Sequence, residues 1–166
     1  MADLEPKMLG KLYATIEQEE CWLPFLNELK RYFRVESAVA QILSAKSESL
    51  QQLWTSRDEQ SQRKAALHDS WANSDANPRF RSPHTGDEFP QIGSDFRNLQ
   101  LGPVELLNMR NGLARCGLGS GFWIDIKLET DTYFSLIFHR QPHDDRDLSA
   151  DEEDRLTNGR LGPTVP

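Results

Sequence analysis

The sequence has no surplus of basic residues. Nineteen Lys and Arg stand against 26 Asp and Glu, which gives a formal net charge of −7. Affinity for nucleic acid depends on clustered Lys and Arg, so this balance excludes a phosphate-binding surface as the main feature of the chain. We therefore expect no direct nucleic-acid partner.

Cysteines and long apolar runs are also scarce. Cys21 and Cys116 lie far apart without CxxC spacing, and residues 1–10 lack the basic segment and apolar run of a signal peptide. No stretch approaches the roughly 18 apolar residues of a membrane helix, since charged residues interrupt even residues 122–138. These absences predict a cytoplasmic protein with no membrane partner.

Aromatic residues, by contrast, are plentiful. Eight Phe, four Trp and three Tyr among 166 residues are too many for a disordered chain and suffice for one hydrophobic core. We expect one folded domain over residues 1–157. Residues 158–166, with Gly and Pro and little else to fix them, are expected to form a disordered tail.

The sequence predicts helices at both ends. An apolar stripe with a spacing of four predicts a helix over residues 4–20, and residues 22–33 place their large apolar side chains on one face. The stripe consists of Leu4, Met8, Leu12 and Ile16. Ser149 and Glu152 have the spacing of a capping box, which predicts a final helix over residues 150–156.

The middle of the chain alternates between strand and helix signals. Residues 37–43 and 50–55 read as one hairpin, and residues 121–129 and 132–139 as another. A helix is expected over residues 58–71, and a shorter one over residues 104–111. Together these segments predict an α+β fold, with a central antiparallel sheet of about five strands and flanking helices.

Residues 73–100 are rich in Pro, Gly, Ser, Asp and Asn, so turns dominate there. A loop of this length in a compact domain is often a binding loop or a lid. Aromatic side chains from sheet, helix and loop could line a ligand site beneath it, although each could equally fill the core. The predicted ligand-binding residues are Trp54, Trp71, Phe80, Phe96, Trp123 and Phe134.

The sequence contains only weak signals of catalysis. Residues 117–121 are rich in Gly but lead into a strand, so close backbone packing explains them better than a phosphate cradle. Pro142 prevents a helix from aligning His139 with His143, which favours a solvated loop over a metal site. His68 fits a hydrogen-bonded structural imidazole, and Cys116 has only Arg115 as a possible activator. We expect no catalytic residues, no metal and no cofactor, and therefore no enzyme.

Several short sequence segments resemble the N-terminal sensory domain of LuxR-type helix-turn-helix transcriptional regulators, which has a PAS/GAF-like fold. The resemblance covers about residues 8–157. It is carried by Trp22-Leu-Pro-Phe25, by the helix that runs into a loop with Asp75 and Arg79, by Gly112-Leu113 and by Cys116-Gly-Leu-Gly119. The likeness ends near residue 157, before the DNA-binding module such regulators carry.

The resemblance implies a regulatory function without direct DNA binding. In that hypothesis the sheet and residues 73–100 enclose a pocket for an unidentified small molecule, and occupancy biases packing in a homodimer. The helix over residues 4–20 is expected to form the two-fold interface. The alternative is a non-catalytic interaction module with a filled core, which dimerises or binds a paralogous regulator.

Overall fold

The computed structural model describes residues 11, 14–15, 17–44, 46–47, 49–81 and 90–158. Five strands form one antiparallel sheet in the order β2-β1-β5-β4-β3. The strands are β1 (Ser37–Ser44), β2 (Ser49–Arg57), β3 (Gln91–Ser94), β4 (Gly121–Glu129) and β5 (Thr132–His139). This architecture confirms the predicted α+β fold and its antiparallel sheet.

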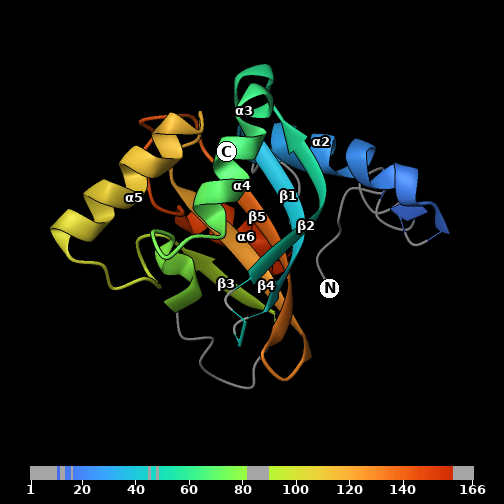
Figure 1. Ribbon diagram of the computed structural model, residues 1–166. Helices are drawn as coiled ribbons and strands as arrows, with labels where there is room; N and C mark the ends of the chain where they lie inside the picture. Colours follow the sequence, from blue (N-terminus) through green and yellow to red (C-terminus); the bar gives the residue numbers. More distant parts are fainter. Residues whose placement is uncertain are drawn as a thin grey trace.

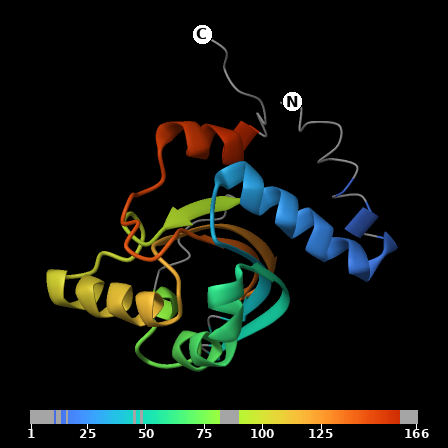
Figure 2. The ribbon, with the colours of Figure 1, turned by 90° about the horizontal axis from the view of Figure 1, so that it is seen from above.

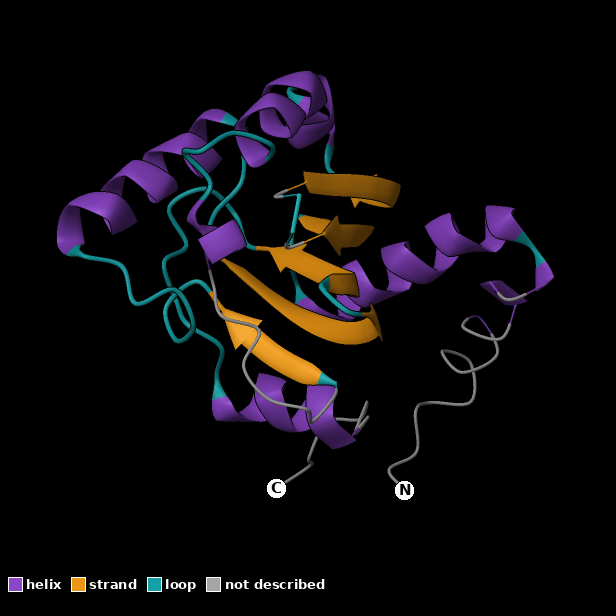
Figure 3. Ribbon diagram, turned by 60° about the horizontal axis from the view of Figure 1, so that its bottom comes forward, coloured by secondary structure: helices purple, strands orange, loops and turns teal. Residues whose placement is uncertain are grey.

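Helices cover both faces of the sheet (Figures 1 and 2). The helical segments are η1 (Glu19–Cys21), α2 (Trp22–Phe33), α3 (Glu59–Arg63), α4 (Ala65–Ala72), η2 (Pro78–Arg81), α5 (Pro103–Arg115) and α6 (Ala150–Asn158). In Figure 2, α2 and α6 lie on one side of the sheet, and α4 and α5 lie on the other. Figure 3 shows the twisted strands between these two helical layers.

Successive side chains of the central strands point to opposite faces of the sheet, so each face contributes to a separate apolar cluster. Ala38, Phe122 and Phe138 point toward α2, where Phe25, Leu26, Leu29 and Phe33 complete an apolar cluster. On the opposite face, Trp123 and Ile137 join Met109 and Leu113 of α5. The α2 face is therefore purely apolar along its centre, whereas the other face mixes apolar and polar side chains.

Both predicted hairpins and two of the predicted helices are confirmed. The pairing runs from Ser37 to Arg57 in β1 and β2, and from Gly121 to His139 in β4 and β5. Helix α2 occupies residues 22–33 as expected. At the start of α6, the Ser149 amide donates to Glu152 Oε2 at 2.8 Å, and the Glu152 amide donates to Ser149 Oγ at 3.2 Å.

The structure corrects three predicted boundaries. Residues 73–100 contain η2 and the edge strand β3, which is too short to show a period of two. The helix expected over residues 58–71 is broken at Lys64, whose φ and ψ of −105° and 14° are not helical. Helix α5 continues through Gly112 to Arg115, and the glycine is explained by packing, because a Cβ at position 112 would collide with the indole of Trp71.

Two predictions concern residues that the structure does not describe. The predicted stripe of Leu4, Met8, Leu12 and Ile16 is not among the described residues, and neither are residues 159–166 of the predicted tail.

The final helix extends to Asn158, two residues beyond its predicted end. Within the described ranges no helix is long and apolar enough to cross a membrane.

Candidate functional site

The sheet face beneath α4 carries a cavity of about 30 Å³. One buried water needs roughly 10–15 Å³, so the cavity has room for about two waters. Its apolar lining consists of Val39, Leu43, Leu50, Ala72, Trp123 and Ile137. Its polar lining consists of Gln41, Gln52, His68, Asn77, Arg79, Asp125, Ser135 and His139.

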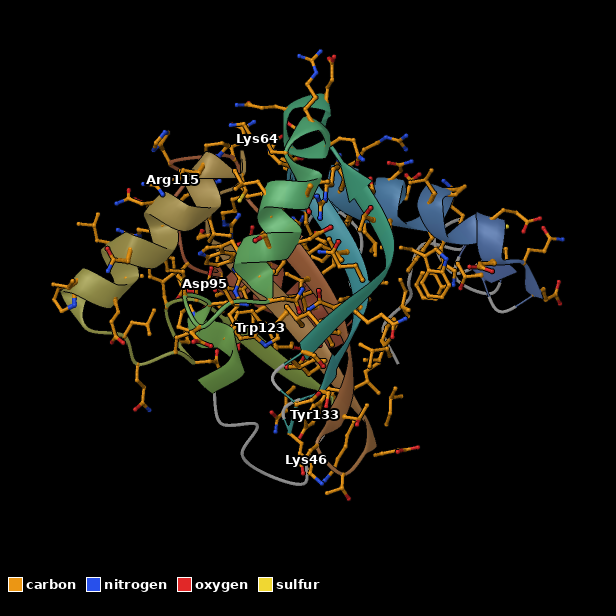
Figure 4. The ribbon with its side chains drawn as sticks, viewed as in Figure 1. Lys46, Lys64, Asp95, Arg115, Trp123 and Tyr133 are labelled. Atoms are coloured by element: carbon orange, nitrogen blue, oxygen red, sulfur yellow. The ribbon has the colours of Figure 1, made fainter. Side chains whose placement is uncertain are left out.

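Strand periodicity brings these side chains together. Alternate residues of β1, β4 and β5 face α4, so Gln41, Asp125 and Ser135 lie level with one another across three strands. The Ser135 hydroxyl donates to the Asp125 carboxylate. Trp123, which Figure 4 places low on this face, packs over Gly93 of β3, where any side chain would collide with the indole.

An ion pair between Arg79 and Asp95 closes one end of the cavity. Arg79 Nε and Nη2 donate to Asp95 Oδ1 and Oδ2, each at 2.8 Å, and both side chains are largely removed from solvent. The Gly121 amide donates to Asp95 Oδ2 at 2.6 Å. A bidentate pair of this kind fixes the guanidinium plane, so it sets the position of η2 over the sheet.

Two buried imidazoles lie beside this ion pair. Arg79 Nη1 is 3.0 Å from Nε2 of His139, and Arg57 Nη2 is 3.3 Å from Nδ1 of His68. Burial, together with the Arg57 charge, lowers the pKa of His68 to about 4. Burial and the Arg79 charge hold the pKa of His139 well below its usual range. Both rings are therefore neutral near pH 7.

Three polar atoms of the lining residues lack any hydrogen-bond partner. They are Gln41 Nε2, His68 Nε2 and His139 Nδ1, and all three side chains are at least 95% buried. Buried polar groups without partners are uncommon, and they often mark a site for water, an ion or a ligand. The cavity therefore has unused hydrogen-bonding capacity.

The structure separates the six aromatic residues predicted to bind a ligand. Of the five whose side chains are described, only Trp123 lines the cavity. Trp54 and Phe134 lie on the α2 face, where Trp22 stacks on Trp54 at 4.5 Å and lies 5.9 Å from Phe134. Because the cavity opens on the other face, those two residues cannot reach it.

The other three have separate positions. Trp71 packs against Gly112 of α5, and Phe96 lies under the Arg110 guanidinium at 5.2 Å. Phe80 belongs to η2, but its side chain is outside the described residues. A role for these residues in ligand binding stays a prediction.

Sequence reasoning was wrong about His139 and right about His68. His139 ends β5 and is 2% exposed, so the solvated loop begins only after it, and His143 is exposed as expected. His68 is buried and hydrogen-bonded, as predicted. Burial raises the pKa of the Cys116 thiol, which disfavours a reactive thiolate. Among the described side chains, no three His, Cys, Asp or Glu are grouped to hold a metal ion.

The polar residues of the cavity were missed as a group. Arg79 was noted with Asp75, but its partner is Asp95, sixteen positions away, and Asp75 is exposed. The one available signal was the polar Gln41 in the middle of an otherwise apolar predicted strand. A polar residue there indicates a polar site on the buried face of the sheet.

Comparisons with known proteins identify similar folds but no family for this chain. No protein-family model matches the chain, and no curated protein matches it. The N-acylhomoserine lactone dependent LuxR family transcription factor CepR2 from Burkholderia cenocepacia has a similar structure, with a TM-score of 0.52 and 13% identity. The match covers 91% of this chain and 87% of that chain.

A second solved structure is similar at a lower level. The photoproduct state of GAF3 from Slr1393 of Synechocystis matches with a TM-score of 0.49 and 10% identity, over 93% of this chain and 87% of that chain. The match to CepR2 supports the predicted α+β fold. At 13% identity it establishes the fold alone.

The buried ion pair generates a stability prediction. Asp95→Asn removes the negative partner and leaves the Arg79 guanidinium buried without compensation, which costs about 3–5 kcal/mol of unfolding free energy. Urea denaturation measures the loss. Glu59→Gln is the control, because its pair with Arg63 is exposed and contributes less than about 0.5 kcal/mol. Equal losses in both variants would contradict the assigned role of Asp95.

The two neutral histidines generate a pH prediction. Unfolded-state histidines take up protons below about pH 6.5, whereas folded His68 resists protonation until about pH 4. The unfolded chain thus binds more protons in this window, and the unfolding free energy falls on acidification by up to about 1.4 kcal/mol per pH unit for each histidine. Urea denaturation at about pH 7 and about pH 5 measures the slope. His68→Gln should reduce the slope and leave the contribution of His139, whereas His143→Asn should leave the slope unchanged; a flat wild-type profile contradicts the prediction.

Proposed function

We propose that this domain is a non-catalytic regulatory module that binds a small molecule in the cavity beneath α4. The observation that carries the proposal is the presence of three unpartnered buried polar atoms around one cavity, on Gln41, His68 and His139. Each such atom costs about 1–3 kcal/mol when left without a partner, and a bound molecule would remove that cost. The fold, shared with a transcription factor that depends on a small molecule, supports this use.

A chain of polar contacts links the cavity to α6. Ser94 ends β3, and the next residue, Asp95, holds Arg79 at the cavity. Its neighbours Ser94 and Arg97 bind Asp147 at 2.6 and 3.1 Å, just before α6 begins. Arg97 also donates to Glu153 of α6 at 2.6 Å. A displacement of Arg79 by a ligand would therefore be transmitted to α6 through residues 94–97, and this is the route by which we propose that the cavity is coupled to α6.

Filling the cavity from within tests the proposal. Val39 is 2% exposed and lines the cavity, so Val39→Phe occupies the space at a cost of about 1–3 kcal/mol in stability. Small molecules that raise the melting temperature of the wild type in a library screen should have no effect on this variant. Val104→Phe, at a position 71% exposed, is the control and should keep every hit. A library without a single hit that depends on Val39 contradicts the proposal.

The small size of the cavity favours a second candidate, a protein-interaction module that dimerises. Two side chains one turn apart on α5, Val104 and Leu107, are the most exposed large apolar residues among those described, at 71% and 57%. Exposed apolar surface of this kind often marks a binding face. The surface on α5 is an alternative to the helix expected over residues 4–20.

Sedimentation equilibrium tests the second candidate. A homodimer that uses α5 should persist at roughly ten micromolar and dissociate on Leu107→Glu, because a carboxylate would be buried at the two-fold interface. Leu67→Glu, at an equally exposed position on α4, should leave the dimer intact. A monomeric wild type at that concentration rules the homodimer out.

A further inference from the structure

The two ends of the cavity differ in charge. His139 lies level with Ser37 and Gly121, whereas the Asp125 carboxylate lies level with Ser135, four residues back along β5. At about 3.3 Å per residue, these levels are about 13 Å apart. An anion bound at the histidine end would therefore not face Asp125.

Both histidines present an N–H group at their unpartnered nitrogen. A guanidinium can only donate, so His139 Nε2 accepts from Arg79 Nη1 and the proton of the neutral ring resides on Nδ1. His68 Nδ1 faces two donors, Arg57 Nη2 at 3.3 Å and Gln52 Nε2 at 3.4 Å.

The carboxylate of Asp69 also lies near His68 Nδ1, at 3.4 Å. Two donors face His68 Nδ1, whereas Asp69 is 52% exposed and its Oδ1 is shared with Arg57, so we assign the proton of His68 to Nε2. The rings of His68 and His139 lie 5.7 Å apart. Two unused N–H donors are thus close together at one end of the cavity.

This end also carries excess positive charge. Asp95 balances Arg79 through two short bonds, but Arg57 has a weaker ion pair, with Asp69 at 3.3 Å. The Arg57 side chain is 2% exposed and its Nε and Nη1 have no partner, whereas Asp69 is 52% exposed. The charges of Arg57 and Arg79 both lower the pKa of His139, as a local positive potential requires.

We infer that the ligand is an organic acid whose carboxylate accepts hydrogen bonds from His139 Nδ1–H and His68 Nε2–H. This inference rests on the proposed function, that the cavity binds a small molecule. The apolar remainder of the acid lies along Val39, Ile137 and Trp123. The space of about 30 Å³ suits the two carboxylate oxygens, so admitting the remainder displaces α4 and η2 outward.

Matched acids and amides test the inference. Isothermal titration of the full chain with hexanoate and benzoate should give affinities at least about tenfold higher than with hexanamide and benzamide, because only the acids bring a negative charge to these donors. His68→Phe should reduce the acid affinity by about tenfold and leave the amides unchanged. Glu59→Gln, remote from the cavity, should change neither.

The possible outcomes separate the two hypotheses. If amides bind as well as acids and Val39→Phe abolishes both, the cavity binds small molecules but the carboxylate inference is overturned. If acids bind and Val39→Phe has no effect, the site lies elsewhere and the inference is overturned as well. If neither class binds while other compounds depend on Val39, only the carboxylate inference fails.

A spectroscopic measurement keeps the inference testable if His68→Phe does not fold. Long-range ¹H–¹⁵N correlation on wild-type protein with ¹⁵N-labelled histidine reports which ring nitrogen carries the proton. The expected tautomers are Nδ1–H for His139 and Nε2–H for His68. The opposite tautomer at His139 would remove the donor and overturn the inference without bearing on the proposed function.

Discussion

The buried ion pair between Arg79 and Asp95 is the constraint on which the rest of this face depends. It joins η2 to the end of β3, it orients the guanidinium that fixes the His139 tautomer, and it receives the amide of Gly121 at the start of β4. Removing two charges from water is expensive, and it is tolerated only where both are fully hydrogen-bonded. The pair therefore specifies one position of η2 and leaves little freedom for alternatives.

The two faces of the sheet are stabilised in different ways. Toward α2, Phe33, Phe122 and Phe138 pack with ring centroids 5.0–5.7 Å apart, and a filled apolar core of this kind stabilises the domain without further requirements. Toward α4, the same strands place Gln41, Asp125 and Ser135 in a row. Stability there depends on a network of polar partners, which is incomplete at three atoms of the cavity lining and at two nitrogens of Arg57. One face therefore carries a filled apolar core, and the other keeps unused hydrogen-bonding capacity.

The parts of the fold that follow local rules could be predicted from sequence. Periodicity located α2 and both hairpins, and the capping box at Ser149 located the start of α6. The predictions that failed concerned features that depend on contacts between residues far apart in the sequence. The glycine at position 112 makes room for the indole of Trp71 and does not end α5, and β3 is recognisable only from its pairing with β4. The site was harder still to predict, because the prediction relied on aromatic residues. The site is formed instead by polar side chains sixteen to sixty positions apart, such as Arg79 with Asp95 and His139.

The size of the cavity and its chemistry point in opposite directions, and the chemistry is the more informative. A space for two waters suits an interaction module with a filled core, and the exposed residues of α5 agree with that function. Such a module gains nothing from three buried unpartnered polar atoms, each of which costs about 1–3 kcal/mol, or from an incompletely paired Arg57 beneath α4. A ligand-binding domain gains specificity from the same groups, because they favour a state in which a bound acceptor completes the network. The unpartnered polar atoms that an interaction module leaves unexplained are thus the feature that the proposed sensor requires, and displacement of Arg79 is the step that would couple binding to α6.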